Sequence, residues 1–390
     1  MVKGFQVVVV RDYDPRSDLT SVEKLEKSCE VGSLLVDLMG DPLARIRQSP
    51  SFHMLVAEIG NEIVGMIRGT IKMVTRGGNA LLDPGHQHDG VSPEIRTTKL
   101  AFVSGLRVSP FFRRMGIGLK LVQRLEEWFR QNDAIYAYVQ TENDNAASVK
   151  LFTEKSGYSK YRTPTFLVNP VFNHRVSVSR RVKIIKLASS DAESLYRSRF
   201  SSTEFFPSDI NSILTNKLSL GTFLAVPRGS DYVPGSLPDP SGSWAVISIW
   251  NSKDVYKLQV QGVSCLKRTL AKTTRVFDGA FPFLKIPSFP NLFKPFAMHF
   301  LYGIGGEGAR AAEMVEALCS HAHNIARKSG CAVVAAEVAS CEPLRVGIPH
   351  WKVLSPEDLW CLKRLRDDEG DDDWTKSAPG LSIFVDPREI

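Results

Sequence analysis

The chain contains 390 residues with a mass of 43.3 kDa, of which 43% are hydrophobic and 23% charged, and it carries a formal net charge of +7. This balance is typical of globular proteins and excludes a largely disordered chain, a collagen-like repeat and a coiled coil. At roughly 100–200 residues per domain, the length predicts about two domains. No apolar run approaches the roughly 18–20 residues of a membrane span, so we expect a soluble protein.

The net positive charge and the spacing of the cysteines indicate which ligands and which cellular compartment to expect. A basic protein can attract a polyanion or a phosphate-rich cofactor, but RNP sequences, zinc-finger spacings and basic helices are lacking, so we do not expect nucleic-acid binding. The six cysteines lack metal-ligand spacing and indicate thiols in a reducing compartment. The short apolar run near the N-terminus predicts a strand rather than a signal peptide. We therefore expect an intracellular protein, in the cytoplasm or the nucleus, without a metal site.

The first hundred residues predict strands and one helix. Residues 5–11 are rich in β-branched side chains and predict a strand, and capping groups followed by apolar periodicity predict a helix over 18–25. Gly60-Asn61 separates two runs of β-forming residues, which predicts a hairpin over 53–74. Residues 75–99 contain Gly, Pro, His and Asp without periodicity and predict an inserted loop.

A buried strand and an amphipathic helix are predicted next. The mostly apolar run 100–108 predicts a strand in the middle of a sheet. The helix that begins at about Ile117 carries its large apolar residues on one face; these are Leu121, Val122, Leu125, Trp128 and Phe129. Residues 134–139 predict another strand, and 145–157 predict a short helix with a glycine C-cap.

The second half repeats this order of elements: hairpin, buried strand, Gly-rich turn, amphipathic helix, strand. The predicted elements are strands at 181–187, 220–226 and 298–304, helices at 191–200 and 309–327, a hairpin over 244–263, and a last strand at 331–338. We interpret the repeat as a tandem duplication, with one domain over 1–170 and another over 171–390.

The turn between the buried strand and the long helix has the features of a phosphate site. Helix N-termini expose unpaired N–H groups and a partial positive charge, which suit a pyrophosphate. Gly116 and Gly118 allow the backbone to approach a ligand closely, and Arg113 and Arg114 add cationic donors. The sequence therefore predicts a phosphate-binding turn rather than a plain strand–helix connection.

These residues carry a resemblance to a known family. The pattern Arg113-x-x-Gly116-x-Gly118, followed by Asn145 and a helix that leads to Gly157, resembles the GNAT superfamily of acyl-CoA N-acyltransferases over roughly residues 5–170. Nearly the whole chain is similar to the plant HOOKLESS-type N-acetyltransferases, with the specific matches at 205–210, 217–223, 302–308, 347–354 and 384–389. The resemblance implies an α/β (α+β) fold of tandem GNAT-like domains, each a central mixed, mainly antiparallel sheet flanked by helices, the second degenerate.

The resemblance also implies acetyl-CoA as the cosubstrate. The expected pyrophosphate-binding residues are Arg113, Arg114, Met115, Gly116, Ile117 and Gly118. The strand through Leu106 and Val108 is expected to pair its edge with the pantetheine arm. Asn145 matches an Asn that supports the cofactor in the family, although capping of its own helix is an alternative role.

The two usual catalytic groups of the family are missing from their places. Phe152 stands where many GNAT proteins have a Tyr acid, and residues 100–108 contain no carboxylate for a base. The substitute candidates are Glu142 and Tyr158, with Asp144 and Tyr161 as the alternatives beside them. The resemblance implies transfer of acetyl to an amine, either a protein Lys or N-terminus or a small amine, in plant growth or hormone response. The alternative is a non-catalytic acyl-CoA-binding regulator that acts through oligomerisation, including homo-oligomers, or through partner binding.

The second half departs further from the family pattern. Its turn, 305–308, has the glycines but places Glu307 where a phosphate requires a cation, and a carboxylate repels a pyrophosphate. We therefore expect a degenerate GNAT-like domain that does not bind acyl-CoA.

Overall fold

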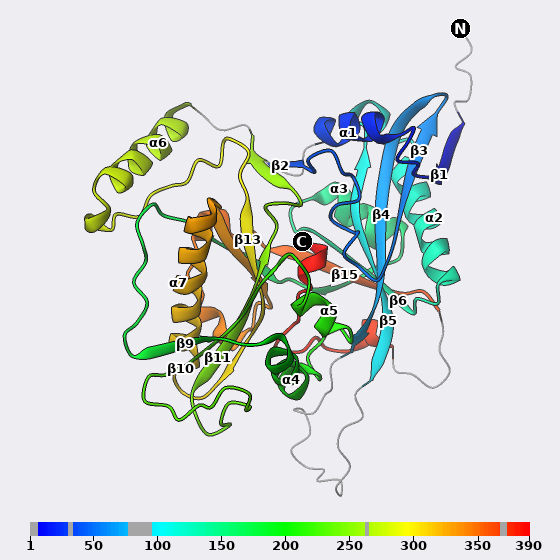
Figure 1. Ribbon diagram of the computed structural model, residues 1–390. Helices are drawn as coiled ribbons and strands as arrows, with labels where there is room; N and C mark the ends of the chain where they lie inside the picture. Colours follow the sequence, from blue (N-terminus) through cyan, green and yellow to red (C-terminus); the bar gives the residue numbers. More distant parts are fainter. Residues whose placement is uncertain (1–6, 30–33, 77–95, 262–264, 367–372) are drawn as a thin grey trace, which may run out of the picture.

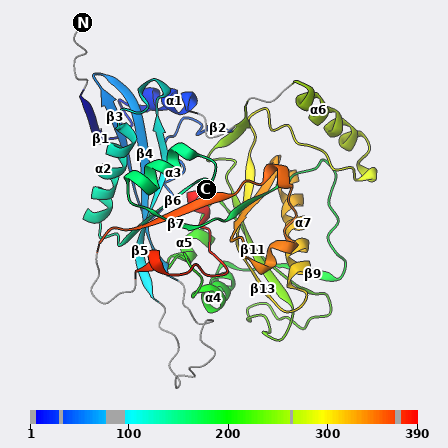
Figure 2. The same cartoon turned by 180° about the vertical axis from the view of Figure 1, so that it is seen from behind.

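The computed structural model describes residues 7–29, 34–76, 96–261, 265–366 and 373–390. Two twisted sheets lie side by side, with α2 on the outer side of one and α7 on the outer side of the other, and the C-terminal segment lies between them (Figures 1 and 2). Most of the predicted inserted loop and of the acidic run 367–373 lies outside the described residues. Among the described residues, no helix has both the length and the apolar character that a membrane crossing requires.

The first sheet has seven strands. In spatial order they are β1 (Val8–Asp12), β3 (Ser51–Ile59), β4 (Glu62–Thr75), β5 (Thr97–Val108), β6 (Tyr136–Glu142), β15 (Asp358–Arg364) and β7 (Ser159–Arg162). The β5–β6 pair is parallel, and the other pairs are antiparallel. The predicted hairpin is confirmed as β3–β4, with Gly60 at φ +62° in the turn.

Helices cover both faces of this sheet. They are α1 (Leu19–Ser28), α2 (Ile117–Gln131) and α3 (Ala146–Lys150), which continues as a π-helical turn (Leu151–Lys155). The apolar face of α2 packs on the sheet as its periodicity predicts, with Leu121, Leu125 and Phe129 fully buried. Full burial of such a side chain stabilises the fold by about 1.5–3 kcal/mol.

The second sheet has six strands. In spatial order they are β8 (Thr165–Pro170), β14 (Val333–Val338), β13 (Met298–Glu307), β11 (Trp244–Asn251), β10 (Ser219–Pro227) and β9 (Val182–Lys186). Its helices are α4 (Ser189–Phe200), α5 (Ile210–Leu214), α7 (Ala311–Ser329) and, at the edge of the molecule, α6 (Cys265–Ala280). As in the first sheet, only the pair that the long helix connects, β13–β14, is parallel.

A matching bulge in each sheet supports the interpretation as a tandem duplication. Against β4, strand β5 carries an extra residue at Gly105, which has φ +60°. Against β11, strand β13 carries an extra residue at Gly303, which has φ +59°. A Cβ atom on either glycine would lie 2.4 Å from a neighbouring side chain, so both bulges require glycine.

The two halves of the chain exchange strands. β8 belongs to the first half along the chain but pairs with β14 in the second sheet. β15 comes near the C-terminal end and lies between β6 and β7 in the first sheet. Relative to the expected boundary at residue 170, each sheet takes one strand from the other side of the chain.

The predicted hairpin over 244–263 is wrong. Both edges of β11 are taken, by β10 and β13, so the next segment has no free edge there. Instead β12 (Lys257–Val260) crosses to the first half and pairs with β2 (Leu34–Asp37), a strand that local pattern did not indicate.

A shared core and a buried ionic cluster hold the halves together. Tyr138 of the first sheet packs in one apolar cluster with residues of the second sheet. The Lys72 ammonium lies 3.1 Å from an Asp386 carboxylate oxygen and 2.6 Å from one of Glu389, and the Tyr138 hydroxyl donates to Glu389. Removal of one member of such a buried cluster costs about 3–5 kcal/mol, so the C-terminal segment is held firmly between the sheets.

Candidate active site

The parallel strands β5 and β6 separate part-way along their length. They pair from Leu100 to Val103, and beyond this point the Gly105 bulge turns β5 away from β6. A cavity of about 300 Å³ opens between residues 104–107 of β5 and 140–142 of β6. The separated edges leave backbone donors and acceptors free to bind an extended ligand arm.

The predicted phosphate-binding turn lies at the end of β5. Arg114 and Gly116 have φ of +64° and +77°, and α2 begins directly after Gly116 without a side-chain cap. A Cβ atom on Gly116 would meet no atom within 4 Å, so the space over the first N–H groups of α2 is open. Arg113 and Arg114 are exposed beside it. These groups suit a pyrophosphate.

The other predicted cofactor residues lie close to the cavity. Leu106 and Asn145 line it, while Val108 is within van der Waals range of a Cβ on Gly118. The Asn145 side chain accepts the Ser148 N–H at 3.2 Å, so it caps α3. Met115 remains 46% exposed. The start of α2 at Gly118 thus lies next to the Leu106 and Val108 side chains of β5.

The two predicted catalytic residues lie in different places. Glu142 is half-buried and lines the cavity, and burial raises the pKa of its carboxyl above the usual range, with a further contribution from Asp144. Tyr158 does not line the cavity. Its ring is 3% exposed and packs edge-on against Phe152 on the α2 side of the sheet, where burial and Glu126 raise the pKa of its hydroxyl.

Three further carboxylates line the cavity, and residue patterns did not indicate them. Asp358 lies on β15, Glu337 lies on β14, and Glu389 belongs to the C-terminal segment. Asp358 is directly opposite Glu142 in the β15–β6 pair. Burial raises the pKa of Asp358 to about 7, with a contribution from Glu142. The sequence around each of these three carboxylates could not predict that they meet, because the exchange of strands between the halves brings them together.

The turn 305–308 of the second half has different surroundings from the turn 113–118 of the first half. A Cβ atom on Gly308 would lie 2.6 Å from the Gly242 carbonyl oxygen, and the Arg310 N–H donates to the Ser243 hydroxyl at 3.2 Å. The loop between β10 and β11 therefore covers this turn. Beside the β13–β14 pair the cavity is about 10 Å³.

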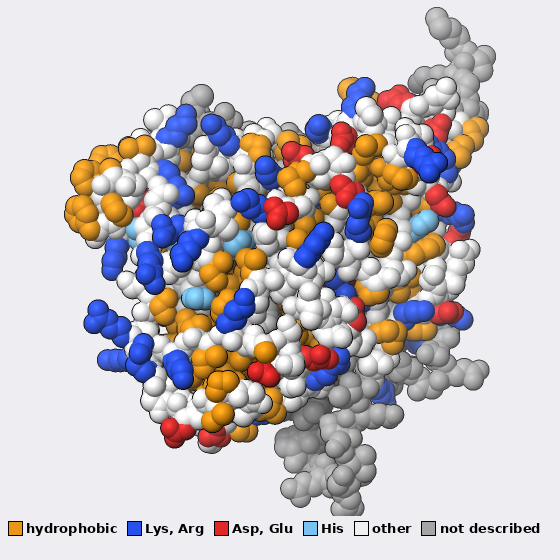
Figure 3. Space-filling view, viewed as in Figure 1, with side chains coloured by type: hydrophobic (Ala, Val, Ile, Leu, Met, Phe, Trp, Pro, Cys, Tyr) orange, Lys and Arg blue, Asp and Glu red, His pale blue; other side chains and the backbone are white. Residues whose placement is uncertain are grey.

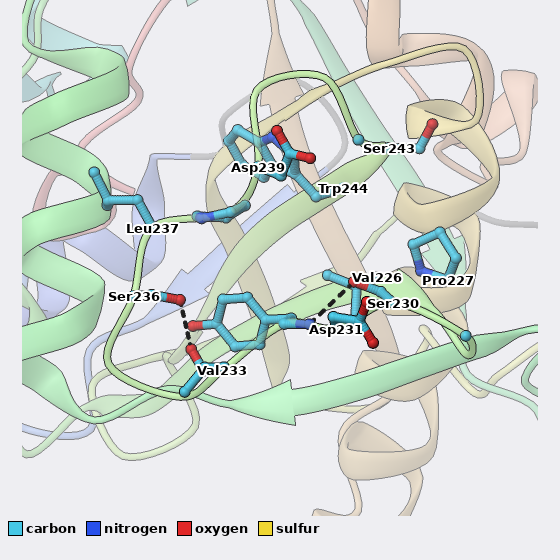
Figure 4. Close-up of a pocket in the computed structure, with 14 residues that line it drawn as sticks. Val226, Pro227, Ser230, Asp231, Val233, Ser236, Leu237, Asp239, Ser243 and Trp244 are labelled. Atoms are coloured by element: carbon cyan, nitrogen blue, oxygen red, sulfur yellow. Dashed lines mark hydrogen bonds between the residues drawn. The ribbon is translucent and has the colours of Figure 1, made fainter.

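A larger cavity than the one between β5 and β6 lies elsewhere. It has a volume of about 650 Å³ and lies under the loop between β10 and β11 (Figure 4). Its described lining contains Asp231 and Asp239 but no Lys or Arg. The cavity between β5 and β6 is linked to the predicted phosphate-binding turn through Leu106, which lines it and lies 4.0 Å from a Cβ position on Gly118.

Solved structures share the fold of this chain. The GCN5-related glucosamine N-acetyltransferase region of a fungal multi-domain GH3 β-N-acetylglucosaminidase superposes with a TM-score of 0.56 at 14% identity, over 92% of this chain and 38% of the other. Saccharomyces cerevisiae N-myristoyltransferase with bound myristoyl-CoA also gives 0.56, at 10% identity, over 92% of this chain and 79% of the other. The fold is thus the GNAT-type acyltransferase fold.

Sequence relatives narrow the class. A sequence model of the Acetyltransferase (GNAT) family matches residues 19–158. Probable N-acetyltransferase HLS1 and Probable N-acetyltransferase HLS1-like, both from Arabidopsis thaliana, are 62% and 60% identical over 98% of this chain and 100% and 99% of their own length. Acetyl transferase GW6a from Oryza sativa subsp. japonica is 37% identical over 98% of each chain. The chain belongs to the GNAT acetyltransferase family, in the group that contains HLS1, and the expected resemblance is confirmed.

Proposed function

We propose that this protein transfers an acetyl group from acetyl-CoA to an amine, with a protein Lys or N-terminus as the favoured acceptor. The observation that carries the proposal is the cavity between β5 and β6, which carboxylates line and which reaches Leu106, 4.0 Å from a Cβ position on Gly118 at the start of α2. The expected setting in plant growth or hormone response, inside the cell, belongs to the same proposal.

Different residues of the first half would bind different parts of acetyl-CoA. The N–H groups after Gly116, with Arg113 and Arg114, would hold the pyrophosphate. The separated edge of β5 through Leu106 would pair with the pantetheine arm. Holding the thioester beside the amine raises the rate of transfer through positioning. Transfer could therefore proceed although Phe152 replaces the usual Tyr acid.

The size of the cavity favours a short acyl group. About 300 Å³ must hold the acyl group, the end of the pantetheine arm and the acceptor nitrogen. Phe152 and Phe166 form part of its wall and exclude water from the thioester. An acetyl group fits these limits better than a long chain.

Two measurements test the proposal. Acetyl-CoA at 100 times its Kd should stabilise the fold by about 2.7 kcal/mol and raise the melting temperature. Incubation with labelled acetyl-CoA and pools of peptides and small amines should then yield an acetylated product. Binding without transfer to any pool would favour the alternative, a non-catalytic acyl-CoA-binding regulator, and no thermal shift would contradict both.

A further inference from the structure

Four carboxylates from both halves of the chain line the cavity between β5 and β6 and form what we call its acidic wall: Glu142, Glu337, Asp358 and Glu389. Glu142 and Asp358 are partners in the antiparallel β6–β15 pair, so their side chains leave the same face of the sheet. Glu337 on β14 and Glu389 of the C-terminal segment complete the wall from the other side. Like charges directly opposite in a sheet are destabilising, so a cation bound between these two side chains is favoured.

The described residues leave these carboxylates without enough hydrogen bonds. Glu337 is 4% exposed; one of its oxygens accepts the Trp360 indole N–H at 2.8 Å, and the other has no partner in the described part of the chain. One oxygen of Glu389, which is 6% exposed, is also unpartnered there. Buried carboxylate oxygens of this kind favour a ligand that donates hydrogen bonds.

The cations near the cavity are engaged elsewhere. Arg107 and Arg45 also line the cavity, and Arg107 lies 3.4 Å from the Glu26 carboxylate. Arg45 donates to the Ile390 carbonyl oxygen at 3.3 Å and lies over the Tyr256 ring. Lys72 neutralises Asp386 and one oxygen of Glu389. Glu142, Glu337 and Asp358 have no ion pair among the described residues.

We propose that Glu142, Glu337 and Asp358 form the acceptor site, that this site binds the acceptor as an alkylammonium group, and that Asp358 removes a proton from it. The inference rests on the proposed function, because the thioester is placed between β5 and β6. It assigns the acceptor site to strands from both halves, so the second half contributes directly to the reaction.

The proton and electron balance is complete with these groups. The ammonium gives one proton to the Asp358 carboxylate, and the freed lone pair on nitrogen forms a bond to the thioester carbonyl carbon. The tetrahedral intermediate collapses with cleavage of the C–S bond. The sulfur leaves with the electron pair and takes the proton from Asp358, and the second proton lost by nitrogen passes through Glu142 to solvent.

The same wall sets the acceptor class. An alkylammonium without a neighbouring carboxylate, such as a lysine side chain, gains charge-assisted hydrogen bonds here. A free α-amino acid brings its own carboxylate against Asp358, which is charged above about pH 7, and is disfavoured. Because the pKa of Asp358 is about 7, the rate should fall as pH drops below this value and Asp358 becomes protonated.

Variants of single carboxylates test the site with N-acetyl-lysine amide as the acceptor. Asp358→Asn should lower kcat at least tenfold and remove the change in rate near pH 7. Glu337→Gln should raise KM for the amine at least fivefold. Both should keep the Kd for acetyl-CoA within twofold of the parent value. Glu357→Gln, an exposed neighbour outside the cavity lining, is the matched control and should change none of these values.

A binding measurement separates this inference from the proposed function. Calorimetry with 1,5-diaminopentane and CoA-saturated protein should show binding that an Asp358→Asn/Glu337→Gln variant weakens at least tenfold. Diamine binding without transfer by the parent protein would contradict the proposed function and leave the cation site standing. Unchanged kcat and KM in both single variants would overturn the inference and leave the proposed function standing.

Discussion

At the scale of single residues, we expect acyl-CoA binding to depend most on Gly116. Its φ of +77° and the empty space around it serve the approach of a phosphate to the first N–H groups of α2. A side chain there would fill this space, and a carboxylate at Arg113 would repel the ligand. We expect Gly116→Val and Arg113→Glu each to weaken acetyl-CoA binding at least tenfold in calorimetry.

Gly330 provides the matched control for backbone strain. It has φ +76°, likewise has no atom within 4 Å of a Cβ position, and ends α7 far from the turn. Gly330→Val should therefore cost about 1–2 kcal/mol of stability, as Gly116→Val does, while affinity is retained. Equal affinities in all variants would show that the phosphate binds elsewhere.

Two buried histidines predict a loss of stability in acid. His299 and His323 are at most 1% exposed, and burial lowers the pKa of each to about 4. Below pH 6.5 these two histidines bind protons in the unfolded chain but stay neutral in the folded protein. Their contribution to the free energy of unfolding is therefore fully present above pH 6.5 and is lost as the pH falls towards 4. The loss should approach about 3 kcal/mol per histidine, at 1.36 kcal/mol per pKa unit.

Denaturant unfolding at pH 7 and pH 5 measures this effect. The His299→Gln and His323→Gln variants should show a smaller difference between the two pH values than the parent protein. His53→Gln changes a ring that is 25% exposed and should leave the difference as it is. Parallel pH curves for the parent and both buried-site variants would contradict the prediction.

At the scale of elements, the exchange of β8 and β15 makes each half incomplete without the other. β15 fills the space between β6 and β7 and covers the edge of β6 that carries Gln140 and Glu142. Without it, that edge and the apolar face around Tyr138 would be exposed to water and prone to aggregation.

Fragments test this dependence. A fragment of residues 1–170 should aggregate or lack a cooperative thermal transition, and co-expression with 171–390 should restore a folded complex that binds acetyl-CoA. A fragment of 1–170 that melts cooperatively and binds acetyl-CoA with the affinity of the whole chain would refute the expected dependence.

At the scale of the whole molecule, the duplication by itself would predict two acetyl-CoA sites. The surroundings of the turns 113–118 and 305–308 predict only one. Around Gly308 the loop between β10 and β11 occupies the space that is open around Gly116, and Glu307 lies 3.7 Å from Arg199 rather than facing solvent alone. We expect one acetyl-CoA per chain, bound in the first half. Equilibrium dialysis with labelled acetyl-CoA should give a stoichiometry of one; a value of two equivalent sites would contradict it.

The charge of the molecule is also distributed unevenly. Lys and Arg side chains gather over the half that carries α6 and α7 in the view of Figure 3. The acidic wall of the cavity, in contrast, is buried between the halves. The net charge of +7 therefore describes the surface and not the proposed acceptor site.

Much of the fold and half of the candidate site could be predicted from the sequence. The β3–β4 hairpin, α2 and the turn 113–118 depend on residues that are neighbours along the chain, so their patterns were sufficient. The repeat of elements indicated the duplication, and the matching bulges at Gly105 and Gly303 agree with it.

The tertiary structure alone decided which strands pair and which carboxylates meet. A strand pattern shows which face is buried but not which edge it joins, because pairing depends on contacts between distant segments. For that reason β15 went unnoticed, the predicted hairpin over 244–263 was wrong, and Asp358 and Glu337 were not among the candidates. The conformation of the turn 113–118 is local and could be predicted from its residues, whereas the acidic wall exists only where the two halves of the chain exchange strands.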